Sequence, residues 1–509
     1  MSIFSHIQSS KPKSNTFDLS HDRKMSLNMG ELVPIFVMDC LPGDKISMST
    51  SQMLRFAPMV APVMHRVSVY THFFFVPNRI MWENWESFIT GGEDGLDASV
   101  FPTLNVANVG NGSLGDYLGL PTVTSQSPSI PVSAMPWAAY QACFNEYYRD
   151  QNLQTPIDWK LTDGTQASGA PFVTLRTRAW QHDYFTSALL WTQKGPEATI
   201  PLGTEAPLLY ENPSSNPTIM RNPATGAAKA ASTPNQVLLT GILANSTSEP
   251  MAADVSGHMV ADLSTATAAT INELRQAFRL QEWLEKNARG GSRYIESMLS
   301  HFGVKSSDAR LQRPEFLGGG RSPVTISEVL QTSSAASEPT PQGNMAGHGI
   351  SVGANNSFSY FCEEHGYIIG IMSVMPKTAY QQGVPKHFKK FDKFDYYWPS
   401  FAHLGEQPIL NYEIYADDDG DDDEVFGYTP RYAEYKYIPS SVHGEFRSTL
   451  DFWHMGRIFA SRPALNETFI QCDPTDRIFA VTDAEKLYAH VHHRIRAQRR
   501  MPYFGTPRM

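Results

Sequence analysis

The chain has 509 residues, a formal net charge of −10 at pH 7 and 18% charged residues. This acidic balance excludes a general polycation, so any contact with nucleic acid must come from a local basic patch. Glycine and proline number 35 each, and 11% of the residues are aromatic. This composition is typical of strands joined by long loops, with much surface buried against partners. The length usually predicts several domains, but a large all-β domain with long loops is an exception.

The four cysteines, Cys40, Cys143, Cys362 and Cys472, are far apart and form no C-x-x-C pair. This spacing favours buried thiols in a reducing compartment over a disulfide framework or a metal site. No apolar run approaches the length of a membrane span, and the first residues lack the apolar stretch of a signal peptide. We therefore expect assembly in a cytoplasm and no insertion into a membrane.

Residues 1–30 are polar, with a small basic cluster at Lys11 and Lys13, and we expect them to form an N-terminal arm. Residues 31–193 are expected to hold the first strands and long loops. Apolar or alternating runs predict strands at 32–39, 44–50 and 67–75. The prolines and glycines between these runs favour turns and edge strands over a central parallel sheet.

The strand predicted at 67–75 carries aromatic residues on both faces at its end. One face has Val67, Val69, Phe73 and Phe75, and we expect it to pack inside, while Phe74 points to the other side. A short helix is predicted after Asn78. It carries an apolar cluster that we name as the candidate subunit interface: Trp82, Trp85 and Phe88. The alternative is that this cluster only extends the core of its own chain.

The composition changes at Thr192. From there to Ala277 the only aromatic residue is Tyr210, and alanine, threonine, serine, proline and asparagine dominate. Disorder is one interpretation. The apolar runs at 237–244 and 258–263 favour a surface insertion instead, which we place at 194–268.

A helical and loop excursion is predicted at 269–350, with helices at 269–291 and 292–303. Residues 351–509 return to strand character and end in a basic tail. Strands are predicted there at 358–376, 408–415, 468–473, 476–483 and 486–496. Strands therefore occur at both ends of the chain, which favours an antiparallel sandwich over a doubly wound α/β fold, because regular strand–helix alternation is absent.

Two motifs suggest chemistry only weakly. Gly349, Ser351 and Gly353 match G-x-S-x-G, but a loop precedes them and an extended segment follows, so a nucleophile elbow is not predicted. The acidic run at 417–424 fails the EF-hand pattern because Tyr415 would be the first ligand. A solvated loop is the simpler interpretation, and Asp417, Asp419 and Asp421 are weak candidates for a cation. We expect no catalytic residues, no cofactor and no enzyme activity.

The C-terminal tail has no acidic residue after Glu485. In the predicted strand at its start, Tyr488, His490, His492, Arg494 and Arg496 lie on one face, and apolar residues lie on the other. A strand with such a face suits phosphate contact without reading of bases, and the two aromatic residues near the end suit stacking on unpaired bases. The candidate DNA contacts are Arg494, Arg496, Arg499, Arg500, Arg508, Tyr503, Phe504, Lys11 and Lys13. A subunit interface facing carboxylates is the alternative.

Four blocks of the sequence resemble the major capsid protein of the Microviridae, in particular the gokushovirus-like branch. They are "QMLRFAPMVAPVMHRVSVYTHFFFVPNRIMWENWESFITGG", "NARGGSRYIESMLSHFGV", "LQRPEFLGGG" and "YTPRYAEYKYIPSSVHGEF". They are scattered over most of the chain in the order expected of the family. The resemblance implies an all-β core, an eight-stranded antiparallel jelly roll with long insertions and several short helices in its loops.

The same resemblance implies a function and partners. Sixty copies would form a T=1 icosahedral shell, through pentamer and three-fold contacts, around a circular single-stranded DNA genome. Further partners would be a small basic DNA-binding protein, an internal scaffolding protein, a DNA pilot protein and a host surface receptor. The protein would be a virion component assembled in the bacterial cytoplasm. The insertion at 194–268 would form a three-fold protrusion used in host attachment. The rival functions are a jelly-roll carbohydrate-binding module and a polysaccharide hydrolase.

Overall fold

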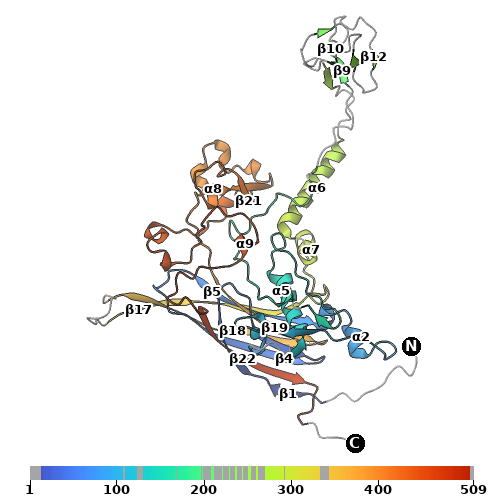
Figure 1. The fold of residues 1–509 in the computed structure, drawn as a ribbon, viewed down its shortest axis with the longest axis vertical. Helices are drawn as coiled ribbons and strands as arrows, with labels where there is room; N and C mark the ends of the chain where they lie inside the picture. Colours follow the sequence, from blue (N-terminus) through green and yellow to red (C-terminus); the bar gives the residue numbers. More distant parts are fainter. Residues whose placement is uncertain are drawn as a thin grey trace. The chain divides into compact units, whose positions relative to one another are not determined.

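The computed structural model describes residues 13–504, apart from 107–108, 123–129, 168, 197, 199–207, 292, 333–342 and several short stretches between 211 and 269. Contacts divide the chain into two compact units (Figure 1). The first, which we call the sandwich unit, comprises Met1–Thr192 and Asn287–Met509. The second, the insertion unit, comprises Gln193–Lys286.

Two antiparallel sheets form the centre of the sandwich unit. The six-stranded sheet has the order β1-β22-β4-β18-β17, with β2 also paired to β22. Its strands are β1 (Asn15–Asp18), β2 (His21–Leu27), β4 (Lys45–Phe56), β17 (Thr325–Leu330), β18 (Met345–Phe361) and β22 (Leu487–Arg499). The four-stranded sheet has the order β16-β5-β19-β3. Its strands are β3 (Val33–Cys40), β5 (Val67–Pro77), β16 (Glu315–Pro323) and β19 (Gly366–Pro376). The predicted antiparallel β architecture is therefore confirmed.

The segment expected to be an N-terminal arm contributes two of these strands. Asn15 pairs with Arg499 in the register of β1 and β22, and His21 pairs with His493 in the register of β2 and β22. Residues 15–27 thus belong to the sheet. Backbone hydrogen bonds to β22 give these polar residues an ordered position that their composition did not predict.

One hydrophobic core lies between the two sheets and contains residues from both. Phe73 and Phe75 of β5 meet Ile46 and Leu54 of β4 in this core. The expectation that the face with Val67, Val69, Phe73 and Phe75 packs inside is confirmed. Burial of such large side chains is the main stabilising contribution to the sandwich, at roughly 1.5–3 kcal/mol for each.

A second core covers the other face of β5. Phe74 and Val76 pack there with α4 (Met135–Cys143), whose residues are all buried except Pro136. A π-helical turn, η1 (Phe144–Tyr148), continues α4. Because helices cover one face and the second sheet covers the other, β5 is buried on both faces. This explains why its sequence becomes aromatic at both parities.

Short elements surround the second core. They are α1 (Asn78–Met81), α2 (Trp85–Thr90), α3 (Leu114–Leu118), α5 (Ala170–Val173) and a three-stranded sheet of β6 (Thr103–Val106), β7 (Ile130–Ser133) and β8 (Thr165–Gln166). The third core packs the long connection from β19 to β22 against Tyr184, Phe185 and Ala188. That connection contains η2 (Lys386–Lys389), η3 (Lys393–Asp395), η4 (Pro399–Phe401), β20 (Glu406–Leu410), α8 (Asn411–Ile414), β21 (Val425–Pro430), η5 (Ala433–Tyr435), η6 (Gly444–Arg447), η7 (Asp451–Trp453) and α9 (Glu467–Ile470).

Three strand predictions in the C-terminal part need correction. Residues 408–415 are strand only as far as Leu410, and α8 follows. Residues 468–473 begin inside α9, because the Asn466 side chain accepts a hydrogen bond from the Phe469 amide at 2.9 Å and caps a helix there. Residues 476–483 form only an isolated bridge through Phe479. Apolar runs of this length do not distinguish strand from short helix or loop.

The insertion unit consists of short strands and most of one helix. Its strands are β9 (Leu208–Tyr210), β10 (Met220–Arg221), β11 (Ala228–Lys229), β12 (Gln236–Val237), β13 (Leu243–Ala244), β14 (Pro250–Ala253) and β15 (Met259–Ala261). The helix, α6 (Ile271–Gly290), and the following α7 (Tyr294–Phe302) confirm the two predicted helices. Among the described residues, no helix is both long and apolar enough to cross a membrane.

Candidate nucleic-acid and subunit interfaces

Strand β22 has one buried and one exposed face. Leu487, Val491 and Ile495 are buried, whereas Arg494 and Arg496 are exposed. The predicted alternation of this strand is therefore confirmed. β22 lies in the middle of the six-stranded sheet, between β1 and β2 on one side and β4 on the other.

The outward side chains of three neighbouring strands form one polar surface. Arg494 pairs in register with Ser49, and Ser49 with Ser357. Arg496 pairs with Ser47, and Ser47 with Ser359. We call this surface the arginine–serine face: Ser47, Ser49, Ser357, Ser359, Arg494 and Arg496. A shallow cavity of about 470 Å³ lies over it. The serine hydroxyls and arginine guanidinium groups are hydrogen-bond donors arranged in rows. Phosphate oxygens accept hydrogen bonds from such donors without requiring a particular base sequence.

Neither arginine of this face is neutralised by an ion pair within the described residues. An acidic residue, Asp18 of the neighbouring strand β1, lies directly opposite Arg496 in the strand pairing. Its carboxylate accepts hydrogen bonds from Ser20, which lower the pKa of Asp18, and Arg496 and Arg494 lower that pKa further. Asp18 therefore offsets part of the positive charge of the two arginines, while neither guanidinium group is held in an ion pair among the described residues.

The other candidate contacts in the tail fall into two groups. Arg499 forms an ion pair with Asp44 at 3.1 Å and donates a hydrogen bond to the Asp39 carbonyl at 3.1 Å. The charge of Arg499 is therefore neutralised by a residue of its own chain. Arg500 is exposed and packs over Gly43. The structure thus separates a structural arginine from exposed ones, a distinction that the sequence did not contain.

The aromatic candidates of the tail stack on one another. Tyr503 lies parallel to Phe17 of β1, with ring centroids 5.6 Å apart, and Phe504 meets Tyr503 edge-on at 5.4 Å. Both tail residues remain largely exposed, and so does Lys13. Lys11 and Arg508 lie outside the described residues.

The histidines of β22 have two different environments. His492 lies 2.6 Å from Asp22, and this hydrogen bond lowers the pKa of Asp22. His490 lies 3.6 Å from the same carboxylate. His493 points inward, contacts Thr50 at 3.0 Å, and has its pKa lowered to about 4 by burial.

The candidate subunit interface of Trp82, Trp85 and Phe88 requires correction. Trp82 is only 1% exposed, and its Nε1 donates to Asp163 at 2.8 Å. Trp82 is thus covered by its own chain, because α4 and the segment at Leu161 close over it. Trp85 is half-buried and Phe88 is 38% exposed. Only the outer part of the cluster is available to a neighbour.

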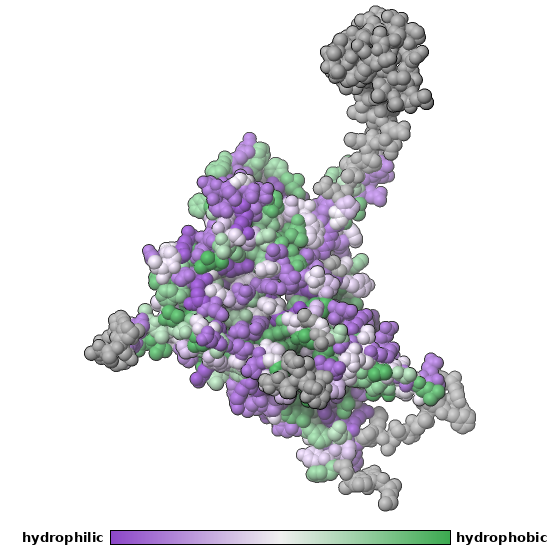
Figure 2. Space-filling view, in the orientation of Figure 1, coloured by the Kyte–Doolittle hydropathy of each residue, from purple (hydrophilic) through white to green (hydrophobic). Residues whose placement is uncertain are grey.

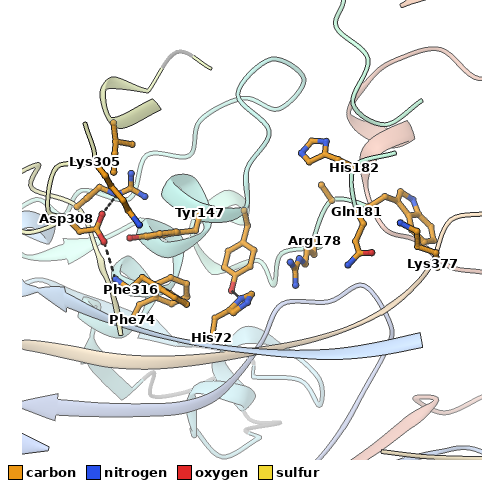
Figure 3. Close-up of a pocket in the computed structure, with 15 residues that line it drawn as sticks. His72, Phe74, Tyr147, Arg178, Gln181, His182, Lys305, Asp308, Phe316 and Lys377 are labelled. Atoms are coloured by element: carbon orange, nitrogen blue, oxygen red, sulfur yellow. Dashed lines mark hydrogen bonds and ion pairs between the residues drawn. The ribbon is translucent and has the colours of Figure 1, made fainter. Parts of the chain in front are cut away.

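Figure 3 shows a pocket of about 660 Å³ that the sequence did not predict. Its lining combines aromatic rings with basic side chains, and Asp308 is its one carboxylate. Arg313 lies 4.4 Å from the centre of the Tyr147 ring and 3.4 Å from Asp308. His72 contacts the Tyr148 hydroxyl at 2.8 Å, and burial lowers the pKa of His72 to about 4. Arg313 is therefore paired within the chain, whereas the pocket cations Arg178, Lys305 and Lys377 form no ion pair with any described residue.

The acidic loop binds a cation supplied by the chain itself. The carboxylates of Asp417, Asp419 and Asp422 converge on the guanidinium of Arg462, with Asp422 at 3.0 Å and Asp421 at 3.7 Å. Hydrogen bonding to Arg462 is the main cause that lowers the pKa of Asp419. This arginine occupies the position between the carboxylates that a divalent cation would need. Asp417, Asp419 and Asp422 converge closely enough to hold a metal ion, and in this structure Arg462 pairs with them. Asp421, the third candidate from the sequence, lies farther from the centre of the cluster.

Ser351 lies in the middle of β18 and is buried. Its hydroxyl donates to the Pro323 carbonyl at 2.8 Å. Because strand residues continue on both sides, the G-x-S-x-G match does not form a strand–turn–helix elbow. All four cysteines are free and buried.

Comparison with known proteins agrees with this architecture. The family model described as "Capsid protein (F protein)" matches residues 5–509. The "Capsid protein VP1" of Bdellovibrio phage phiMH2K is 40% identical over 94% of this chain and 92% of that protein. The proteins of the same name from Chlamydia phage 1 and Spiroplasma virus 4 are 37% and 33% identical. They align with 99% and 96% of this chain and with 97% and 94% of their own lengths. The chain therefore belongs to the phage F capsid-protein family and is a major capsid protein of the gokushovirus-like Microviridae.

Proposed function

We propose that this capsid protein folds as a jelly roll and forms a T=1 icosahedral shell around a circular single-stranded DNA genome. The observation that carries the genome part of this proposal is the arginine–serine face, an exposed polar sheet face whose two arginines form no ion pair among the described residues. The remainder of the proposal rests on strand order and on the separation of the two units.

Strand order supports the jelly roll. The first half of the sandwich runs β2, β3, β4 and β5, and the second half runs β16, β18, β19 and β22. The pairs β5 with β16, β4 with β18, β3 with β19 and β2 with β22 are nested like the two arms of one long hairpin. Successive strands of each arm alternate between the two sheets. This nested order is the one expected when a long antiparallel hairpin is wrapped into an eight-stranded jelly roll, and in the proposed assignment β1 and β17 are additional strands.

The position of the arginine–serine face supports contact with the genome. In Figure 1, α8 and α9 lie above the two sheets of the sandwich unit, and β22, β4 and β1 of the six-stranded sheet are its lowest strands. The face with helices and long loops suits neighbours and the exterior. A sheet face rich in serine and arginine suits a phosphate backbone, because it provides positive charge and hydroxyl donors without groups that select a base, although Asp18 at its edge offsets part of that charge.

The test of the genome contact is the paired substitution Arg494→Ser and Arg496→Ser, with Arg310→Ser as an exposed control elsewhere in the sandwich unit. We expect the paired variant to assemble shells of normal size that contain less DNA, and the control to package normally. Packaging at the level of the unaltered protein would refute the genome contact. Loss of empty-shell assembly would instead support the alternative, a subunit interface formed by this strand.

The insertion unit is proposed to be the surface protrusion used in host attachment, with its centre at 194–268. Its separation from the sandwich unit by contacts supports an independent role. A reconstruction of the assembled shell tests this proposal. We expect protrusions on the outer surface, and we expect them to disappear when residues 194–268 are replaced by a short linker. Density for these residues on the inner wall would refute the proposal.

The internal scaffolding protein, the DNA pilot protein and the small basic DNA-binding protein remain proposed partners from the family resemblance.

A further inference from the structure

The segment between η2 and η4 exposes an unusual number of aromatic residues. Every residue from 391 to 400 is exposed, and half of them are aromatic. Phe391 has 85% of its surface accessible. We call this surface, together with two tyrosines of the following connection, the aromatic–lysine patch: Phe388, Lys389, Phe391, Lys393, Phe394, Tyr396, Tyr397, Trp398, Tyr435 and Tyr437. Hydrophobic residues are dispersed among hydrophilic ones on the visible face of the molecule (Figure 2). In this patch, by contrast, the rings lie near one another: the ring centroids of Tyr397 and Tyr435 are 6.5 Å apart, and Lys390 lies over both Tyr396 and Tyr435.

The patch is held in position by its own hydrogen bonds. The Trp398 Nε1 donates to the Lys393 carbonyl at 2.8 Å, and Asp395 accepts from the Phe391 amide at 2.9 Å. The Tyr397 ring meets the buried Tyr432 edge-on at 5.0 Å. Exposed rings on a fixed backbone lose little conformational entropy when they are covered, which is a property of binding surfaces.

The size of the patch matches one protein interface. A fully covered aromatic side chain buries about 150–250 Å². Its eight rings each expose about half or more of their surface, so together they offer on the order of 900 Å². A standard interface buries about 800 Å² on each partner. The patch is therefore large enough to be a complete contact surface with another protein.

The patch carries charges of both signs with a small excess of lysine: Lys389, Lys393 and Lys436 are exposed, and so are Asp392 and Asp395. Lys386 and Lys390 are paired within the chain, with Glu413 at 3.4 Å and Glu434 at 3.1 Å. Lys389 and Lys393 form no ion pair with any described residue and instead lie over the rings of Tyr412 and Phe394. Two free lysines beside apolar rings favour a partner surface that is both apolar and acidic.

The same chain presents such a surface at α2 and the loop that follows it. No lysine, arginine or histidine occurs from Ile80 to Tyr148. We call this surface the acidic–apolar patch: Glu83, Glu86, Phe88, Ile89, Glu93, Asp94 and Leu96, all of which are exposed. Leu96 is 79% accessible. The backbone folds back through a hydrogen bond from the Asp97 amide to the Gly91 carbonyl at 3.1 Å, so these residues share one region.

We infer that the aromatic–lysine patch of one subunit packs on the acidic–apolar patch of a second copy. Both patches stay exposed in a single chain, so the chain does not cover them itself. Two acidic–apolar patches facing each other would bring carboxylate against carboxylate, because no cation lies in that stretch of chain, whereas the excess lysine of the aromatic–lysine patch can pair with those carboxylates. The contact is therefore between unlike surfaces, and such contacts close into rings or extend around a shell. The inference rests on the proposed shell function.

Charge reversal tests the contact. The basic reversal combines Lys389→Glu with Lys393→Glu, and the acidic reversal combines Glu86→Lys with Glu93→Lys. We expect each reversal alone to reduce the yield of shells at least about tenfold, because like charges then face each other in the interface. We expect the chain with both reversals to recover most of the yield. Lys160→Glu, at an exposed lysine outside both patches, is the matched control and should assemble normally. Shell yield is measured by sedimentation and electron microscopy, and thermal melting of each variant checks folding.

A second variant makes the result independent of the charge changes. Phe391→Ser removes an exposed ring without touching a core, so it should leave the melting temperature unchanged and still lower the shell yield. Normal yield from the folded single reversals, or no recovery in the chain with both, would overturn the inference. Normal yield from Phe391→Ser with lost binding to host cells would assign the patch to attachment instead. If the unaltered chain forms no shell, the proposed function fails, and that result is distinct from all of these.

Discussion

The guanidinium of Arg499 lies 3.1 Å from the carboxylate of Asp44 and joins the end of β22 to the turn between β3 and β4. The Asp44 side chain is 2% exposed, and its carboxylate also accepts the Leu41 amide at 3.1 Å. Arg499 is therefore the partner of a buried charge, whereas Arg494 and Arg496 point to solvent from the same strand. Three arginines that look alike in the sequence have two different roles.

The first prediction concerns that pair. Arg499→Ala leaves the buried Asp44 carboxylate without a cation, and removing one partner of a buried pair costs about 3–5 kcal/mol. Because Arg499 is partly exposed, we expect the lower end, about 3 kcal/mol. Arg494→Ala, at an exposed position, should change stability by less than about 0.5 kcal/mol. Urea unfolding of the unassembled chain measures both, and equal effects of the two substitutions would contradict the assignment.

The second prediction concerns pH. Burial lowers the pKa of His493 to about 4, from an ordinary value of 6.5. The unfolded chain therefore binds a proton that the folded chain does not bind between pH 6.5 and 4, and stability is lost as the pH falls through this window. The stability that the neutral, buried His493 contributes is fully present above pH 6.5. The loss approaches about 3 kcal/mol at the acid end.

His493→Gln tests this dependence, because glutamine keeps hydrogen-bonding groups near Thr50 and Ile35 without titrating in this range. We expect the variant to lose less stability than the unaltered chain between pH 7 and 5, as measured by urea unfolding at both values. His490→Gln, at a partly exposed histidine of the same strand, is the control and should retain the original slope. Parallel pH profiles for all three chains would contradict the prediction.

The third prediction concerns Trp82. Trp82→Ala removes a fully buried ring and its hydrogen bond to Asp163, and substitutions of this kind cost about 3–5 kcal/mol. The loss should be visible in the unassembled chain, because the chain itself covers the ring. Phe88→Ala, at a partly exposed ring of the same cluster, should cost about 1 kcal/mol. If Trp82→Ala changed only assembly and left unfolding unaffected, a neighbouring subunit would have to cover the ring.

Local pattern was enough to predict β5 and β22, because a period of two in a strand is encoded in the residues themselves. It was not enough for Trp82, whose cover comes from α4 and Leu161, far away in the sequence. The pocket of Figure 3 is lined by residues of several separate segments, and no single segment indicates it. Likewise, the acidic loop suggested a cation because its partner, Arg462, lies about 40 residues away in the chain. Pairings between distant residues account for the errors at the candidate sites, whereas the wrong strands at 408–415, 468–473 and 476–483 come from short apolar runs that fit strand, helix and loop alike.

The last prediction concerns the arginine–serine face. Each phosphate neutralised by a lysine or arginine releases counterions, so the logarithm of affinity falls with the logarithm of salt concentration by about 0.7 for each contact on a single strand. Removing two contacts with Arg494→Ser and Arg496→Ser should therefore make the salt dependence shallower by about 1.4. Titration of the unassembled chain with an oligothymidine at several salt concentrations measures the slope. Arg499→Ser should leave the slope unchanged if the variant stays folded, since Arg499 already neutralises Asp44. An unchanged slope in the paired variant, or an equal change in Arg499→Ser, would show that the phosphate contacts lie elsewhere.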